Sequence, residues 1–361
     1  MTSAPTRVAP GTRARPGGRG RMPRVRIATI LLALLALLAI SVVVAIGIGP
    51  ARIAPADVAG TLWAHLTGAH PVLPVTQDAI VWRLRTPRVL TAVVVGGGLA
   101  VCGAVMQALT RNPLADPYLL GLSSGASTGA VLVLVLGAAI ALPAAAFAGA
   151  MIALLLTLGI SRAAGGDSPT STILAGLAVS AVLSALTSLV IFWSSNNDSY
   201  REILGWLLGS LSGADWADVV LVAVVMAACA LPLLSSARVL DSLALGDSAA
   251  AALGVPVDRL RIALFGCCAL LTGALVAVSG SIGFVGLILP HAMRAVVGVR
   301  HRVLLPASFL VGAVFLLWAD TIARTAFDPR ELPVGIVTAL IGGPVFVLLM
   351  MRMGRRRMGR A

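Results

Sequence analysis

Long apolar runs without a charged residue constrain this chain more than any other feature. One of them, Tyr118–Ser161, contains no Asp, Glu, Lys or Arg, and a helix needs only roughly 20 apolar residues to cross a bilayer. Over the whole chain 58% of residues are hydrophobic and 11% are charged. A soluble domain cannot bury so much apolar surface, and the ten-residue alternation of a membrane barrel is absent. The sequence therefore predicts an all-α polytopic membrane helical bundle.

The limits of the apolar runs predict about ten transmembrane helices. We place them at 27–51, 89–110, the two parts of 118–161 on either side of Pro143, 168–195, 219–237, 262–281, 283–299, 303–319 and 332–351. Pro143 divides the long run because proline interrupts helix hydrogen bonding. The run Ile203–Gly213 is too short to span and predicts a partial or interfacial helix. Pro290, His291 and Arg294 interrupt the eighth span, and the two polar side chains could line a transport path.

Arginine-rich tails flank this single membrane domain, which covers residues 27–351. Residues 1–26 hold seven Arg and no acid, and residues 352–361 hold five Arg and no acid. Positive charge beside membrane helices collects on the cytoplasmic side, so both termini are expected in the cytoplasm, as an even number of spans requires. The same rule accounts for the formal net charge of +13 without a nucleic-acid partner.

Missing residue types exclude several functions. The chain has no Lys, so the phosphate-binding loop G-x-x-x-x-G-K-[ST] cannot be present, and any ATP that drives the protein binds to another chain. Its four cysteines lie in apolar runs without metal-ligand spacing, which predicts no metal site. An intramembrane enzyme would need paired aspartates within spans or an H-E-x-x-H site, and Asp320 stands alone at the end of a span. An ion-coupled secondary transporter would need buried carboxylates, which the spans almost lack.

The most polar internal loop, RVLDSLALGDSAAAALGVPVDRLR, covers residues 238–261 and is cytoplasmic in this topology. Asp247 or Ser248 can cap a short helix, Gly254 can end it, and Pro256 prevents its continuation. One interpretation is an ordinary amphipathic surface helix. The other is a compact docking element for an ATPase.

A second polar segment, TRNPLADPYLLGLSSGAS at residues 110–127, predicts a turn between two membrane helices. Its two X-Pro pairs end one helix and begin the next. Gly121, Gly125 and Gly129 then lie four apart, which predicts a smooth face for close helix packing. For Arg111 we expect contact with lipid headgroups, with contact to an ATPase as the alternative.

Five segments in order resemble the FecCD-type permeases, for iron chelates and cobalamin, of bacterial binding-protein-dependent ABC importers. They lie between residues 80 and 352 and read RTPRVLTAVVVGGGLAVCGAVMQALTRNPLADPYLLGLSSGAS, LALGDSAAAALGV, GSIGFVGLILPHAMR, HRVLLPASFLVGAVFLLWADTIAR and ELPVGIVTALIGGPVFVLLM. The resemblance implies the type II ABC importer permease architecture and a multi-pass place in the bacterial cell membrane.

The same resemblance implies partners and cargo. The permease is expected to form a homodimer or a paralogous heterodimer, to act with two ATP-binding cassette subunits and to receive its solute from an extracytoplasmic binding protein. No cofactor is expected on this chain, since ATP binds to the partner subunits. The implied solute is a ferric siderophore, with haem, cobalamin or another large cofactor-like molecule as the alternative.

Three groups of residues match functional positions of the family. Arg85, Arg88 and Arg324 match arginines that dock the binding protein, although an interfacial arginine can also reach lipid phosphate. Thr170 and Ser171 match hydroxyl residues of a cytoplasmic gate, although Ser168-Pro169 before them also reads as a plain helix start. The matched residues of the ATPase coupling loop are Leu245, Gly246, Asp247, Ala251, Leu253 and Gly254.

Overall fold

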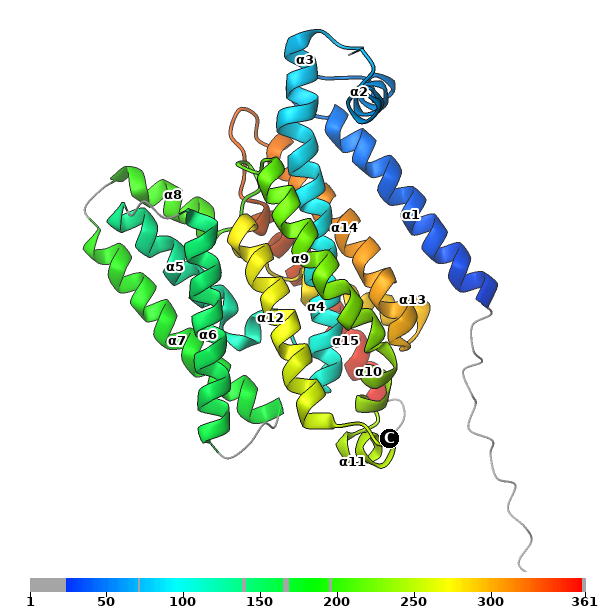
Figure 1. Cartoon of the computed structure of the whole chain (residues 1–361), viewed down its shortest axis with the longest axis vertical. Coiled ribbons are helices and arrows are strands. Elements are labelled where there is room, and N and C mark those ends of the chain that lie inside the picture. Colours follow the sequence, from blue (N-terminus) through cyan, green and yellow to red (C-terminus); the bar gives the residue numbers. More distant parts are fainter. Residues whose placement is uncertain (1–23, 71, 138–140, 165–168, 195–196, 359–361) are drawn as a thin grey trace, which may run out of the picture.

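The computed structural model describes residues 24–70, 72–137, 141–164, 169–194 and 197–358. Within these ranges the regular secondary structure is entirely helical (Figure 1). The predicted all-α bundle is therefore confirmed. Most of the amino-terminal arginine-rich tail, residues 1–23, and the last three residues lie outside the described ranges.

Each of the ten predicted spans coincides with a helix. These helices are α1 (Arg24–Gly47), α4 (Thr86–Leu109), α5 (Leu122–Leu136), α6 (Leu142–Ala163), α7 (Pro169–Trp193), α9 (Trp216–Ser235), α12 (Val257–Ser279), α13 (Val285–Val297), α14 (His301–Thr325) and α15 (Val334–Met358). Among the described residues, eight helices are long and apolar enough to cross a membrane. The other two, α5 and α13, are apolar but have only 15 and 13 residues.

Three helical segments that the apolar runs do not predict lie between the first two spans in the described part of the chain. Helix α2 (Pro55–Thr67) has proline in its first turn and ends at Gly68, whose left-handed φ of 73° turns the chain so that Ala69 N–H donates to the carbonyl of Ala64 at 3.0 Å. After it, α3 (Val75–Ala79) and the π-helical segment η1 (Ile80–Arg85) continue into α4. The second span therefore begins well before the predicted residue 89, and the continuous apolar helix covers Val75–Leu109.

Helix α8 (Asn197–Leu207) takes the place of the predicted partial helix at 203–213. It begins earlier and ends earlier than predicted, and its 11 residues are too few to span a bilayer. The carboxyl-terminal helix also departs from the prediction, because α15 continues to Met358 and so extends into the arginine-rich segment at 352–361.

Helix α4 forms the centre of the bundle and packs most extensively against α14. In its most apolar window 83% of the residues are buried, against 22–33% for most peripheral spans. Glycines allow this close packing: a Cβ atom at Gly96 would overlap the carbonyl of Gly312, and one at Gly103 would overlap the carbonyl of Gly286. Small residues at helix crossings let backbones approach closely. In lipid the hydrophobic effect does not drive helices together, so this close van der Waals packing stabilises the bundle.

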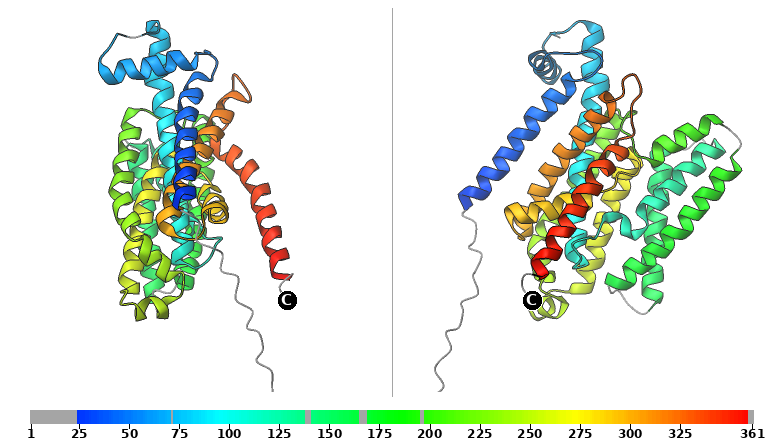
Figure 2. Two further views of the ribbon diagram at one scale, coloured as in Figure 1. Left: turned by 90° about the vertical axis from the view of Figure 1, so that its right-hand side faces the viewer. Right: turned by 180° about the vertical axis from the view of Figure 1, so that it is seen from behind.

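Helices α5, α6, α7 and α8 form a group beside this centre (Figures 1 and 2). The group is joined to the rest mainly through contacts of α12 with α6 and α5. The predicted glycine face of α5 is confirmed: Gly125 and Gly129 lie against the backbone of α6, and Gly121 lies against α7. The 3₁₀ turn η2 (Pro117–Leu120) precedes α5 and is capped by Asp116, which accepts a 2.9 Å hydrogen bond from Tyr118 N–H.

Two ends of the bundle carry the polar residues discussed below. The α2 end is the upper end in Figure 1, where α2 lies beside α3 and above the upper end of α1. The α11 end is the lower end, which carries the short helices α10 (Ala237–Leu243) and α11 (Asp247–Ala252) and the carboxyl terminus. Helices α4, α12 and α14 run between the two ends.

Candidate functional site

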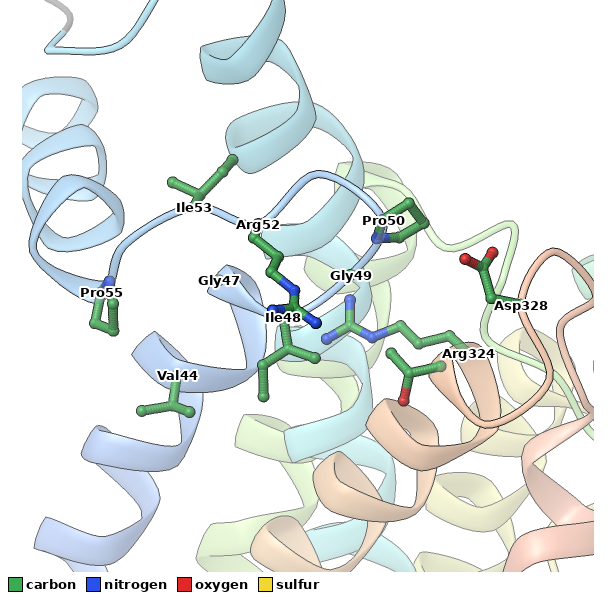
Figure 3. Close-up of a pocket in the computed structure, with 11 residues that line it drawn as sticks. Val44, Gly47, Ile48, Gly49, Pro50, Arg52, Ile53, Pro55, Arg324 and Asp328 are labelled. Carbon is green, nitrogen blue, oxygen red and sulfur yellow. The ribbon is translucent and has the colours of Figure 1, made fainter.

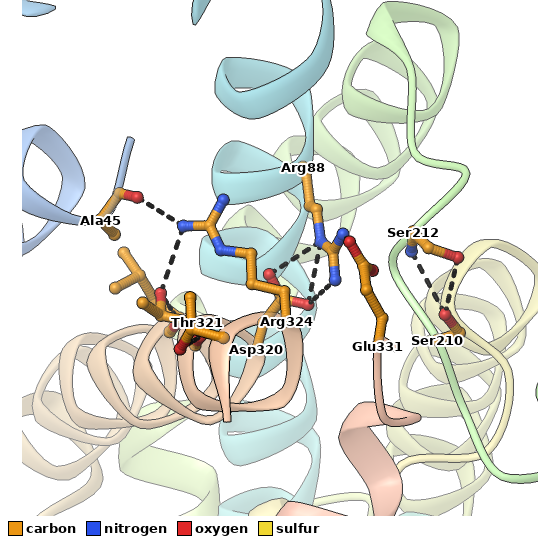
Figure 4. A network of polar contacts seen from close by, with 10 residues as sticks. Ala45, Arg88, Ser210, Ser212, Asp320, Thr321, Arg324 and Glu331 are labelled. Carbon is orange, nitrogen blue, oxygen red and sulfur yellow. Dashed lines mark hydrogen bonds and ion pairs between the residues drawn. The ribbon is translucent and has the colours of Figure 1, made fainter. Parts of the chain in front are cut away.

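Arg88 lies in a buried ion network at the α2 end (Figure 4). Its Nε donates to both carboxylate oxygens of Asp320, at 3.1 and 3.0 Å, and its Nη2 donates to Asp320 Oδ1 at 2.9 Å. Its Nη1 donates to Glu331 Oε2 at 2.7 Å. The Asp320 side chain is 1% exposed, whereas that of Glu331 is 45% exposed. Arg88 therefore joins α4 to α14 and to the loop before α15 through charge-assisted hydrogen bonds.

Arg85 and Arg324 bind the carboxyl-terminal end of α1. Arg85 donates to the carbonyls of Ile46 and Gly47 at 2.9 and 3.3 Å, and to that of Ala51 at 2.8 Å. Arg324 Nη2 donates to the carbonyl of Ala45. The last carbonyls of a helix have no partner within the helix, and arginine side chains satisfy them here. Both arginines are only 7% exposed.

Two recesses open beside these arginines. The first, of about 560 Å³, lies between the end of α1 and the end of α14, and the guanidinium groups of Arg52 and Arg324 point into it (Figure 3). The second, of about 550 Å³, is lined by four arginines and two acids, which are Arg83, Arg85, Arg88, Arg324, Asp215 and Glu331. Arg324 borders both recesses, so the three arginines selected from the sequence do lie together.

The two residues matched to a gate lie where α7 begins. Thr170 is exposed, and Ser171 is half-buried and faces α6. Ser161 on α6 donates to Ser171 Oγ at 3.2 Å, and the Ser161 and Thr172 hydroxyls lie 3.1 Å apart. Ser168, the residue expected to cap this helix, lies outside the described residues. The structure therefore shows a hydroxyl cluster between α6 and α7, to which Ser171 belongs, and the gate itself stays a prediction.

The polar loop at 238–261 folds into α10 and α11, as the sequence predicted for a short helix. The capping prediction is wrong: the residue before the helix is Gly246, with φ of 116°, and no side chain caps the start. Asp247 instead accepts from Arg261 Nη2 at 2.7 Å and from Arg111 Nη2 at 3.5 Å. Leu245 and Leu253 expose 74% and 70% of their surface on either side of α11.

Polar residues of the eighth span bind to the neighbouring helix. Arg294 on α13 donates to the side-chain oxygen of Gln107 on α4 and, at 3.4 Å, to the carbonyl of Ala104. Gln107 in turn donates to the carbonyl of Leu287 at 2.9 Å. These bonds attach the short helix α13 to α4, so Arg294 is engaged within the chain.

Cys102, Cys229, Cys267 and Cys268 are free thiols packed among apolar side chains, as the sequence predicted. No cluster of three or more His, Cys, Asp or Glu that could hold a metal ion occurs in the part of the chain that the structure describes.

Comparison with known proteins identifies the fold and the family together. The profile of the FecCD transport family matches residues 37–352. The chain belongs to the FecCD transport family. It is a multi-pass membrane permease of the ABC importer class, and permeases of this class act with ATPase subunits and a binding protein.

Curated relatives of this FecCD permease carry different substrate names. A cobalamin import system permease, BtuC of Halobacterium salinarum, is 43% identical over 300 residues, which cover 81% of this chain and 80% of that protein. A hemin transport system permease, HmuU of Yersinia pestis, is 42% identical over 79% of this chain and 87% of its own length. A solved inward-facing structure of a metal-chelate type ABC transporter has a TM-score of 0.79 and 35% identity, covering 90% of this chain.

Most of the long-range ion pairs of this FecCD permease are not visible in the sequence. Asp320 seemed to stand alone at the end of a span, yet it pairs with Arg88 across 232 positions of sequence. Glu331 and Arg261 were not singled out either. For Glu331 the sequence offers its position alone, directly before the apolar run 332–351.

Proposed function

We propose that this FecCD permease forms the path by which a large metal chelate enters the cell, and that its energy comes from separate ATPase subunits. A ferric siderophore is the first candidate, and haemin and cobalamin are the alternatives. The match to the FecCD family over residues 37–352 carries the proposal. The names of the relatives, for cobalamin and hemin, support the wider class because both molecules are bulky metal chelates.

The two polar ends of the bundle support a division of roles. We place the α2 end outside the cell, where a binding protein docks, and the α11 end in the cytoplasm, where two ATP-binding cassette subunits bind. Both termini then lie in the cytoplasm, in agreement with their arginine content. The permease pairs with an identical or paralogous copy, ATP binds only to the partner subunits, and the chain itself performs no bond chemistry.

The recess with four arginines favours an acidic partner. Arginine binds carboxylates in a planar, two-pronged geometry that suits docking. Arg83 is exposed, whereas Arg85, Arg88 and Arg324 are buried and already donate to groups of this chain. We propose that the three buried arginines shape the recess and make its electrostatic potential positive. The exposed Arg83 makes the first contact with the binding protein.

Reversing the charge of both Arg85 and Arg324 to Glu is expected to weaken binding-protein association by about tenfold or more at low salt, because two buried carboxylates would oppose the positive charge of the recess. Arg83→Glu should have a smaller effect that fades with salt, since exposed charges are screened within roughly 8 Å at physiological ionic strength. Affinity is measured with the purified complex on a sensor surface. If the Arg85→Glu/Arg324→Glu variant retains its ATPase subunits and binds the binding protein as tightly as wild type at both low and high salt, these arginines do not dock the binding protein.

Uptake assays test the proposed substrate and energy source. Cells that produce the permease with its ATPase and binding protein are given a ferric hydroxamate siderophore, haemin or cyanocobalamin, each labelled. We expect saturable uptake of one of the three, lost on ATP depletion and unchanged by an uncoupler at constant ATP. Uptake of none would contradict the metal-chelate proposal. Uptake that stops with the uncoupler but survives ATP depletion would show an ion-coupled transporter.

A further inference from the structure

The carboxylate of Asp247 connects the short helix α11 to two long helices at once. One oxygen accepts from Arg261 Nη2 at 2.7 Å, in the first turns of α12, and the other accepts from Arg111 Nη2 at 3.5 Å, directly after α4. The Arg261 side chain is 4% exposed and its Nε has no hydrogen-bond partner in the described chain. A buried cation in this position depends on a close carboxylate.

The alternative acid for Arg261 is poorly placed. Asp258 lies on the same helix, but its carboxylate is 3.9 Å from Arg261 Nη1 and its side chain is 79% exposed. Asp247 therefore supplies the short contact. Exposed, longer ion pairs contribute little, whereas a short pair with a buried partner holds its geometry.

The backbone beside Asp247 has two unusual conformations. Arg111 has φ of 51°, a left-handed conformation that residues other than glycine seldom adopt. Gly246 has φ of 116°, and a Cβ built there would lie 3.7 Å from Arg111 Nη1. Two unusual backbone conformations thus meet where the loop after α4 faces the start of α11.

The neighbouring helix α10 is attached to the third central helix. Asp241 Oδ1 accepts from the backbone N–H of His301 at 2.9 Å and lies 2.7 Å from His301 Nδ1, at the start of α14. Helices α10 and α11 are therefore joined by carboxylates to α4, α12 and α14. Two of these, α4 and α14, are joined again at the α2 end by Arg88 and Asp320.

We propose that Asp247 is a positioning residue that transmits ATPase movement from α11 to α4 and α12. The inference rests on the proposed function, in which ATPase subunits bind at the α11 end. A push on α11 moves the central helices only if α11 is fixed to them. The short contact with the buried Arg261 is the main attachment, and the longer, half-exposed contact with Arg111 adds to it. Without this carboxylate, α11 moves under the ATPase while the central helices stay behind.

The test is Asp247→Asn in the full complex of permease, ATPase subunits and binding protein, reconstituted in liposomes. The measured quantity is the stimulation of ATP hydrolysis when the cognate binding protein is added, which requires communication between the two ends of the bundle. We expect stimulation to fall by at least about fivefold, the lower end of ordinary coupling between distant sites, while the ATPase subunits stay bound. Asp258→Asn, in the same loop and beside the same arginine, should behave as wild type.

Arg111→Gln provides a second variant that leaves the buried Arg261 in place. It should reduce stimulation less than Asp247→Asn does, because the Arg111 pair is longer and half-exposed. The double variant Asp247→Asn/Arg111→Gln should be no worse than Asp247→Asn alone, because Asp247→Asn already removes the contact with Arg111. If the double variant loses the sum of the two single losses of stimulation, Asp247 and Arg111 do not act through their mutual contact. Loss of the ATPase subunits from Asp247→Asn would make Asp247 a direct docking residue and overturn the proposal, as would normal stimulation. Absence of stimulation in the wild-type complex would instead contradict the proposed function.

Discussion

Replacing Arg88 by alanine is expected to destabilise the permease by about 3–5 kcal/mol, the usual cost of removing one partner from a buried ion pair. The reason is Asp320, whose side chain is 1% exposed and would lose all three hydrogen bonds that Arg88 donates to it. The change is measured as the shift of the unfolding transition of the purified protein, followed by the fluorescence of its six tryptophans.

Two further variants separate a lost ion pair from a lost side chain. Glu331→Gln should cost only about 0–1 kcal/mol, because a half-exposed pair is screened by water. Arg88→Ala combined with Asp320→Ala should be more stable than Arg88→Ala alone, since no unpaired charge then stays buried. If Arg88→Ala unfolds at the wild-type transition, the network of Figure 4 does not stabilise the bundle.

Apolar runs predicted the class of fold and a helix within each of the ten predicted spans, because hydrophobic length decides where a helix can cross a bilayer. They failed where charge and tertiary contact decide. The start of the second span was placed at residue 89 because Arg83, Arg85 and Arg88 interrupt the run, yet the helix begins at Val75. Arg85 and Arg88 are tolerated there because they donate hydrogen bonds to carbonyls of α1 and to the carboxylate of Asp320, which are remote in sequence, whereas Arg83 is exposed.

Helix α2 could have been found from local signals. Proline at its start and Gly68 after its end are ordinary helix limits. Apolar length does not reveal α2, because its 13 residues are too few to span a bilayer. The short helices α5 and α13 show the opposite error, since their apolar runs predicted full spans but the helices end early. Gly137 and Gly298, both with positive φ, follow their last residues.

The sequence predicted which residues belong to the candidate sites, but not which groups their side chains contact. Resemblance to the family brought out Arg85, Arg88, Arg324 and the α11 loop, and the structure groups the three arginines at one end. Their burial could not be foreseen, because a single sequence does not show which acid or carbonyl faces each guanidinium. Arg111 is a further example: lipid headgroups were expected, and Asp247 is the partner observed.

Gly103→Ala is expected to disrupt the contact between α4 and α13, although alanine is the better helix former. A Cβ atom at this position would overlap the carbonyl carbon and oxygen of Gly286, so backbone must move against backbone. Overpacking of this kind costs about 1–3 kcal/mol, and sometimes more when no flexible side chain can give way. The displacement of α13 should also break the hydrogen bonds between Arg294 and α4.

Gly266→Ala is the matched control, because the same substitution inside α12 places a Cβ with no other atom within 4 Å. There the higher helix propensity of alanine should dominate, and the free energy of unfolding should rise by up to about 1 kcal/mol. The two variants are compared by the unfolding transition and by the yield of assembled complex. Opposite signs at Gly103 and Gly266 are the expected result, since the physical difference between the sites is the distance to the facing helix. A stabilised Gly103→Ala would mean that α4 and α13 do not pack as closely as the structure shows.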